Sequence, residues 1–245
     1  HRADSRRGCP QTPPRRVIHW HDGAAGWQVA TRTRSCGTLP VPANPAEGGP
    51  AMIETPYLLF LGDAPDQLAA KVAQGIRDWR PDNAVGQLRL AGCAADVRLP
   101  DMDLAAAKAA GAMTLVIGVA NRGGVISKDW KKVLVQALEE GFDLASGLHT
   151  LLRDEEDLRA VAHATGRKLH DVRVPGVEYP VASGERRGGK RCLTVGTDCS
   201  VGKMYTSLAV DSEMKARGLK SSFRATGQTG ILITGDGVPL DAVVA

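Results

Sequence analysis

The apolar positions of this chain fall into short continuous runs that alternate with stretches of helical periodicity. The apolar run at residues 57–61 ends at Gly62-Asp63 and predicts a buried strand. A helix is expected from about Pro65-Asp66 until Arg80-Pro81 stops it. Its apolar stripe consists of Leu68, Val72, Ile76 and Trp79.

The alternation continues to residue 174. Strands are predicted at 114–119, 142–145 and 171–174, with a turn at 121–124. Ser127 is expected to cap a helix that Gly141 ends, and a further helix spans 154–164 and closes at Gly166. The inner face of the first of these helices is predicted to hold Trp130, Val133, Leu134, Ala137 and Leu138.

Strands that alternate with helices predict an α/β fold with a parallel sheet, here a Rossmann-like domain over residues 52–175. Ligands bind beyond the carboxyl ends of such strands. This rule places Gly62-Asp63, Asn121-Arg122 and Ser146-Gly147 at the functional edge of the sheet.

The second half of the chain has its own pattern. Residues 176–190 are expected to be a linker, and residues 191–245 a P-loop NTPase-like α/β domain. Strands are predicted at 192–195 and 222–225, with a helix at 203–217 that Gly218 ends and turn-rich loops at 226–230 and 234–239. A P-loop domain needs more strands than these, so this domain is expected to be incomplete.

Residues 1–51 differ from the rest in composition. They hold seven Arg, no Lys and three acidic residues, so the whole net charge of +4 lies here, together with seven of the 14 prolines. A targeting peptide and a nucleic-acid-binding tail are possible interpretations. The favoured interpretation is a disordered or non-native leader ahead of a natural start at Met52.

Composition narrows the functional classes. Charged residues make up 24% and apolar residues 43% of the 245 residues, and no apolar run approaches the roughly 20 residues of a membrane span. Aromatic residues make up only 4%, which disfavours a base-stacking surface for nucleic acid. Five cysteines without a CxxC pair favour a reduced, cytoplasmic setting and no zinc site.

The segment with the clearest chemistry is Gly196-Thr-Asp-Cys-Ser-Val-Gly202-Lys203, between a predicted strand and a predicted helix. Backbone N–H groups of such a loop converge on phosphates, and the Lys adds a positive charge. Two features depart from the usual P-loop: Gly196 lies one residue early, and Met204 replaces the Ser or Thr that binds Mg²⁺. The loop therefore suits phosphate binding better than Mg-dependent hydrolysis of a nucleotide.

Several residues of this segment and of the sheet edge are candidate site residues. Phosphate binding is expected from Thr197, Asp198, Cys199, Ser200, Val201, Gly202, Lys203 and Met204. Asp198 and Ser200 are equally compatible with plain loop capping, and Cys199 with either a nucleophile or a small loop residue. His149 is either a ligand-edge residue or a structural histidine. Substrate contacts are expected from Arg122, Arg224, Gln228 and Thr229.

From Met52 onward the chain resembles a bacterial family of P-loop proteins associated with D-glutamate N-acetyltransferase activity. The resemblance rests on residues 196–204, on Phe223-Arg-Ala-Thr-Gly-Gln-Thr-Gly230 and on Gly235-Asp-Gly-Val-Pro239. Phe142-Asp-Leu-Ala-Ser-Gly-Leu-His149 is a weaker match. Members of the family continue beyond the position of Ala245.

The resemblance implies transfer of an acetyl group from acetyl-CoA to the amine of D-glutamate, without a metal, in D-amino-acid catabolism. It implies that the loop binds the CoA phosphates. Asp198 and His149 are the candidate catalytic bases, and a homo-oligomer is expected. Two alternatives remain open at this point: an ATP-dependent ligase or kinase of dethiobiotin-synthetase type, and a nucleotide-binding protein without turnover.

Overall fold

A computed structural model describes residues 16–18, 29–31, 53–174, 184, 188–198, 201–235 and 237–239, with Arg122 described by its backbone alone. Residues 1–44 and 45–245 form two separate compact units. In the first unit, β1 (Arg16–Ile18) pairs antiparallel with β2 (Val29–Thr31). The prediction of a disordered leader otherwise concerns residues outside those the structure describes, as does most of the predicted linker.

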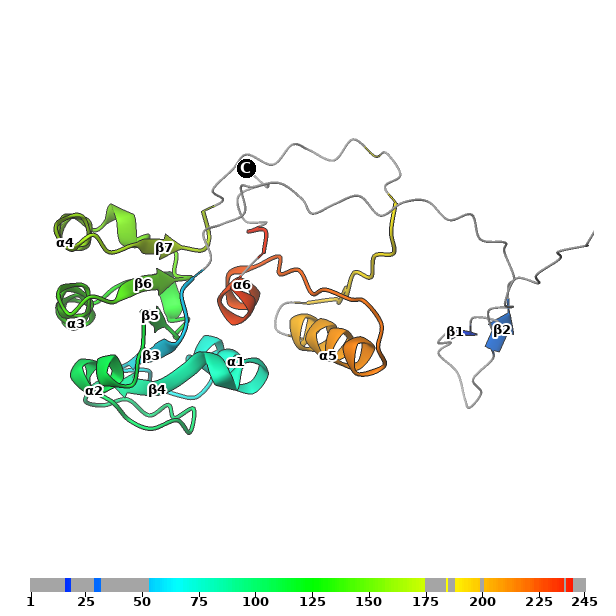
Figure 1. The fold of residues 1–245 in the computed structure, drawn as a ribbon, viewed down its shortest axis with the longest axis horizontal. Helices are drawn as coiled ribbons and strands as arrows, with labels where there is room; N and C mark the ends of the chain where they lie inside the picture. The colour runs from blue at the N-terminus through cyan, green and yellow to red at the C-terminus, as the bar shows by residue number, and fades with distance from the viewer. Residues whose placement is uncertain are drawn as a thin grey trace, which may run out of the picture. The chain divides into compact units, whose positions relative to one another are not determined.

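The second unit is built on a parallel sheet with the strand order β4-β3-β5-β6-β7 (Figure 1). The strands are β3 (Tyr57–Gly62), β4 (Ala84–Arg89), β5 (Thr114–Ile117), β6 (Asp143–Ser146) and β7 (Leu169–Asp171). Their parallel pairing confirms the predicted α/β fold class. The order reverses between β3 and β5, as in doubly wound folds that bind ligands at the carboxyl edge.

Helices cover both faces of this sheet. On one face lie α2 (Leu104–Ala109), α3 (Lys128–Glu139) and α4 (Glu156–Thr165), as Figure 1 shows. On the other face α1 (Lys71–Trp79) packs against α6 (Gln228–Thr234). Short 3-10 helices are η1 (Pro81–Asn83), η2 (Arg122–Gly124) and η3 (Leu152–Asp154).

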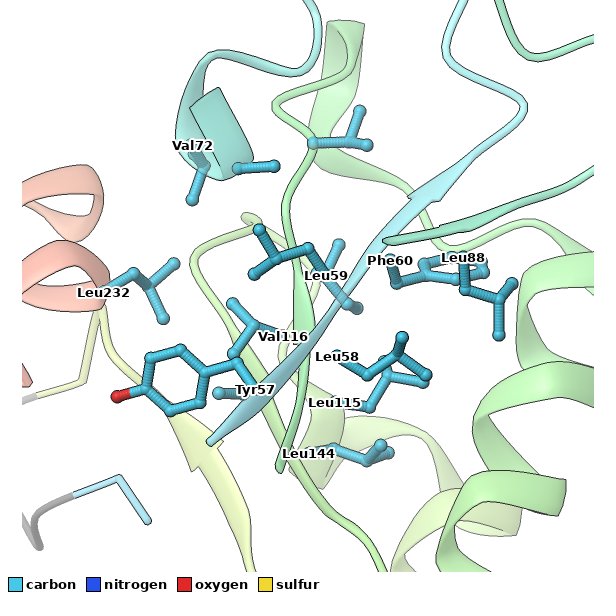
Figure 2. Close-up of a cluster of buried hydrophobic side chains, with 14 of the residues drawn as sticks. Tyr57, Leu58, Leu59, Phe60, Val72, Leu88, Leu115, Val116, Leu144 and Leu232 are labelled. Carbon is cyan, nitrogen blue, oxygen red and sulfur yellow. The ribbon is translucent and has the colours of Figure 1, made fainter. Parts of the chain in front are cut away.

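The central strand β3 is apolar throughout because both of its faces are covered. Figure 2 shows Tyr57 and Leu59 on the side of Val72 and Leu232, and Phe60 on the opposite side. All five of these side chains are at most 2% exposed. Phe60 meets Trp130 of α3 edge to face, with ring centroids 5.3 Å apart. Leu232 belongs to α6, so a helix from the second half of the chain completes the core of the first.

Caps and stops predicted from single residues are confirmed. Ser127 accepts a hydrogen bond from the backbone N–H of Trp130 at 3.2 Å, which caps α3. Gly166 ends α4 in the left-handed conformation, with φ of 67°. Of the predicted inner face of α3, Val133 is only partly buried, whereas the other four residues are buried.

Some element boundaries were wrong. Helix α1 begins at Lys71 rather than near Asp66, because the Asp66 carboxylate accepts from the N–H of Ala69 and caps a preceding turn instead. Leu68 lies in that turn and is 74% exposed. Strand β7 ends at Asp171, where the predicted strand began. Neither β4 nor α2 was predicted from the sequence. In β4 the polar Gln87 and the adjacent Gly86 interrupt the apolar pattern.

In the second half of the chain, α5 (Lys203–Ala216) agrees closely with the predicted helix. The strands predicted at 192–195 and 222–225 were wrong: both segments are described and neither forms a strand, although Ala225 makes an isolated bridge with Gly237. A strand needs a hydrogen-bonded neighbour, and none of the described residues supplies one to 192–195. Leu193 and Val195 are therefore 77% and 76% exposed.

Candidate functional site

An open pocket of about 760 Å³ lies at the carboxyl edge of the sheet. The described residues that line it are His149, Leu151, Asp154, Arg173 and Gln228. They come from the loop after β6, from η3, from the turn after β7 and from the first residue of α6. The pocket thus combines a cation, a carboxylate, an imidazole and an amide around one apolar side chain.

The buried carboxylate of Asp171 holds the loop that carries Leu151 and Asp154. Its Oδ1 accepts from the N–H of Leu152 at 2.7 Å, and its Oδ2 accepts from both N and Nε of Arg153 at 3.2 Å. The Asp171 side chain is only 1% exposed. Hydrogen bonds to a buried charge are among the stronger ones in proteins, so η3 is anchored firmly to the end of β7.

Arg173 and Gln228 are both held against Gly147. The Nε of Arg173 donates to the Gly147 carbonyl at 2.8 Å. A Cβ on Gly147 would lie 2.9 Å from both Cβ and Cγ of Gln228, so only glycine leaves room for the start of α6 here. The loop after β6 therefore positions side chains from two other elements at the rim of the pocket.

His149 is positioned by the 3-10 helix η2, which follows β5. Gly124 has φ of 62°, and a Cβ there would lie 2.6 Å from the backbone nitrogen of His149. The N–H of Thr150 donates to the Gly124 carbonyl at 3.1 Å. The imidazole is exposed to solvent at the pocket rather than buried.

Protein side chains occupy the point where the strand order reverses, so the pocket lies to one side of it. A Cβ on Gly62 would lie 2.5 Å from the indole ring of Trp130, whose Nε1 donates to Asp63 at 2.7 Å. A Cβ on Gly118 would lie 2.5 Å from the Cβ of Ala73. Gly62-Asp63, predicted to lie at the functional edge, therefore supports α3.

The predicted phosphate loop leads directly into α5. Gly202 precedes the helix with φ of 90° and ψ of 10°, a conformation that favours glycine, and this N-cap residue has no side chain with which to cap the helix. The first turn of α5 contains no acidic residue. The Nζ of Lys203 donates to the carbonyl of Asp198, so the ammonium group turns back over the loop. Uncapped N–H groups and an adjacent cation are what an anion requires.

Met204 packs inside the molecule, at the position where most P-loops have Ser or Thr. It is partly buried against the core, and its sulfur would lie 3.3 Å from a Cβ on Gly230 of α6. Thr206 does not replace the missing hydroxyl, because its Oγ1 donates to the Gly202 carbonyl at 3.1 Å. Helix α6 consequently touches the phosphate loop at Gly230 and the pocket at Gln228.

The structure brings together His149 and Gln228 among the residues predicted from sequence. Thr197, Asp198 and Val201 are exposed around the loop, whereas Cys199, Ser200 and the side chain of Arg122 lie outside what the structure describes. Arg224 is exposed ahead of α6, and Gln228 and Thr229 begin this helix rather than lying in the predicted loop.

Leu151, Asp154 and Arg173 were missed. The signal for Arg173 was present, because residues that follow a strand lie at the ligand edge. The sequence pattern placed this residue inside a strand that in fact ends at Asp171.

Nowhere among the described residues do three or more His, Cys, Asp or Glu side chains gather as they would to hold a metal ion. The helices described in this chain are also too short or too polar to cross a membrane.

Family models match most of the second unit. A model described as a domain of unknown function (DUF1611_N), Rossmann-like domain, matches residues 88–175. A model described as DUF1611_C, P-loop domain, matches residues 180–245.

Two curated relatives, both named D-glutamate N-acetyltransferase, are similar to this chain. One, from Tritonibacter scottomollicae, is 80% identical over 194 residues, and the other, from a Pseudoalteromonas species, is 46% identical over 193 residues. Each match covers 79% of this chain and 58% of the relative. The chain therefore spans little more than half the length of these relatives.

A solved structure has the same fold. The crystal structure of a DUF1611 family protein from Anabaena variabilis superimposes with a TM-score of 0.63 at 32% identity. The match covers 77% of this chain and 58% of that protein.

Proposed function

This chain belongs to the DUF1611 family, and from that membership we propose that it acts in the transfer of an acetyl group from acetyl-CoA to the amine of D-glutamate. The observation that carries the proposal is the 80% identity to a relative named D-glutamate N-acetyltransferase. Because the chain spans 58% of that relative, the activity is proposed for the protein of which these residues form the matching part.

The phosphate loop supports a CoA donor. CoA carries a pyrophosphate and a 3′-phosphate, and the Gly202-Lys203 junction offers uncapped N–H groups and an ammonium group. Thr197, Asp198, Cys199, Ser200 and Val201 complete the loop in this proposal. Binding of CoA needs no magnesium hydroxyl, so Met204 can serve as packing against α6. This feature favours the acetyltransferase over an ATP-dependent ligase.

The reaction requires a nucleophilic amine. The acceptor ammonium group loses one proton, and its nitrogen then attacks the thioester carbonyl carbon. A C–N bond forms, the attacking nitrogen gives up a second proton, the C–S bond breaks, and CoA leaves as the thiolate, which takes up that proton. The net products are N-acetyl-D-glutamate, CoA and one proton. A general base and a stabilised oxyanion are the two needs of this chemistry.

His149 suits the general base better than Asp198. Its imidazole lines the pocket together with Gln228, and a neutral imidazole has a ring nitrogen that can accept a proton. The backbone carbonyl of Asp198, in contrast, accepts from Lys203, so Asp198 belongs to the loop that holds the donor. In this proposal Gln228 and Thr229 lie between donor and acceptor, with Arg122 and Arg224 as further substrate contacts.

The test uses the 245-residue chain and a chimera in which its matching 194 residues replace those of the Tritonibacter scottomollicae relative. Each is incubated with acetyl-CoA and a panel of D- and L-amino acids, and thiol release is followed with and without EDTA. We expect the chimera to release CoA thiol with D-glutamate at a rate that EDTA does not change. An inactive chimera beside an active parent relative, or phosphate release from MgATP in place of thiol release, would contradict the proposal.

A further inference from the structure

Arg173 and Asp154 line the pocket beside His149 and Gln228, yet the phosphate loop and the general base give neither of them a task. The two charges are opposite in sign and come from different loops. A site with one cation and one anion is complementary to a zwitterion, and it is poorly suited to a phosphate, which the Asp154 carboxylate would repel.

We propose that this pocket is the acceptor subsite and that Arg173 binds the side-chain carboxylate of an acidic amino acid there. The inference rests on the proposed function, since it assigns the place where that function's acceptor binds. In this arrangement the Asp154 carboxylate attracts the acceptor ammonium group, and His149 lies at the same pocket to take its proton.

The surroundings of Arg173 suit it to this task. Its Nε donates to the Gly147 carbonyl, which orients the guanidinium at the rim of the pocket. A guanidinium held in one plane binds a carboxylate through two parallel hydrogen bonds, which an ammonium group cannot do. Asp154 is fixed in turn, because its 3-10 helix is anchored to the buried Asp171.

Helix α6 brings this subsite close to the donor loop. Gln228 lines the pocket, and two residues later Gly230 packs against Met204, the second residue of α5. Two residues of an α-helix advance about 3 Å. In this proposal the donor phosphates at the start of α5 and the amino acid in the pocket therefore lie next to the same short helix.

The experiment compares Arg173→Gln and Arg173→Lys with the control Arg217→Gln, a change to an exposed arginine at the end of α5 that bonds Glu213 of the same helix. Calorimetry on the 245-residue chain, with CoA present, measures the Kd of D-glutamate and of its neutral analogue D-glutamine. Steady-state kinetics of the chimera measures KM for D-glutamate and for acetyl-CoA.

We expect Arg173→Gln to raise the Kd and KM of D-glutamate roughly 10- to 100-fold, the scale of a hydrogen-bonded charge pair. The Kd of D-glutamine and the KM of acetyl-CoA should change less than about threefold. The Kd of D-glutamate for Arg173→Lys should lie between the values for the unchanged chain and for Arg173→Gln. Equal losses of affinity for D-glutamate and D-glutamine would mean that Arg173 only supports the backbone at Gly147. A rise confined to the KM of acetyl-CoA would assign it to the donor phosphates. Either result overturns the proposal.

Failure of the proposed function has a separate signature. If the chimera acetylates no amino acid, but the chain binds D-glutamate and loses that binding in Arg173→Gln, the pocket is an acidic amino-acid site without this reaction. If the unchanged chain with CoA binds no D-glutamate, the acceptor assignment is wrong whatever the chimera does.

Discussion

At the scale of single residues, Lys203 and Met204 show how neighbouring positions of one motif serve different ends. The ammonium group of Lys203 donates to the Asp198 carbonyl, and its three N–H donors would let it bind a phosphate as well. Met204 instead packs towards Gly230, inside the molecule. Only the first position is thus available to an anion, and the chemistry of the loop depends on it.

Lys203→Ala is expected to weaken CoA binding by about 1–3 kcal/mol, the scale of a hydrogen bond to a charged group, and to leave the Tm unchanged. Titration calorimetry with CoA measures the affinity. Lys220→Ala, a change to an exposed lysine after α5, is the matched control and should leave the affinity as it was. Equal affinities of Lys203→Ala and the unchanged chain would rule out a phosphate role for this lysine.

His170 gives a second prediction at this scale. It lies in β7 with only 9% of its side chain exposed; its Nε2 makes no hydrogen bond and is 3.8 Å from Oδ2 of Asp143. Burial lowers the pKa of His170, and the neighbouring Lys168 acts in the same direction, whereas Asp143 and Glu54 oppose it.

The unfolded chain therefore takes up a proton near pH 6.5 that the folded chain resists. The stability present above that pH is lost as the pH falls from about 6.5 towards the lower pKa of the folded state. Urea unfolding at pH 7 to 5 should show a steeper loss for the unchanged chain than for His170→Gln. Parallel pH profiles of the two proteins would show that His170 does not contribute.

At the scale of secondary structure elements, α6 is the element on which the site depends. Its apolar residues Ile231, Leu232 and Ile233 are buried in the core, and a Cβ on Gly75 of α1 would lie 2.6 Å from Ile233. Next to α6, the Tyr205 ring of α5 meets Trp79 of α1 edge to face, 5.5 Å away. Both the pocket and the phosphate loop are therefore positioned by packing on the same apolar side of the sheet.

Gly147→Ala tests the contact between α6 and the loop after β6. The new Cβ would crowd Gln228 at 2.9 Å, and we expect a loss of about 1–3 kcal/mol of unfolding free energy together with weaker D-glutamate binding. Gly188→Ala is the control, because a Cβ there meets nothing within 4 Å. Denaturant unfolding and calorimetry measure the two effects. Full stability with unchanged binding would mean that α6 does not seat on Gly147 in solution.

At the scale of the whole molecule, the sequence predicted well what is local and poorly what depends on partners. Residues 57–61 predict a buried strand because the helices on both faces of the sheet require apolar side chains there. Ser127 and Gly166 could be recognised because each acts locally, Ser127 through its hydroxyl and Gly166 through its backbone conformation. Of the residues that line the pocket, His149 and Gln228 were predicted. Arg173 was not, because its place at the edge of the sheet depends on where β7 ends. Residues 192–195 have a strand-like sequence, but among the residues that the structure describes they have no hydrogen-bonded strand beside them, which no local pattern reveals.

The exposure of Leu193 and Val195 gives a prediction at this scale. In the 245-residue chain, Leu193→Lys with Val195→Lys should change the unfolding free energy by less than about 0.5 kcal/mol, because neither side chain is packed. Self-association measured by sedimentation velocity should decrease. In the chimera, the same pair should cost several kcal/mol if the rest of the relative covers this segment. A large loss in the 245-residue chain would place both residues in a core.

The position of α6 in the chain also sets the order of events during synthesis. The last strand of the sheet ends at Asp171, yet the helix that covers Tyr57 and Val116 ends at Thr234, 63 residues later. At about 5–20 residues per second, a ribosome needs roughly 3 to 13 seconds to make that stretch. During this interval the part of the apolar face that α6 later covers is exposed, although α1 has already been made, and exposed apolar surface is what chaperones bind. The formation of α6 thus also ends this exposure.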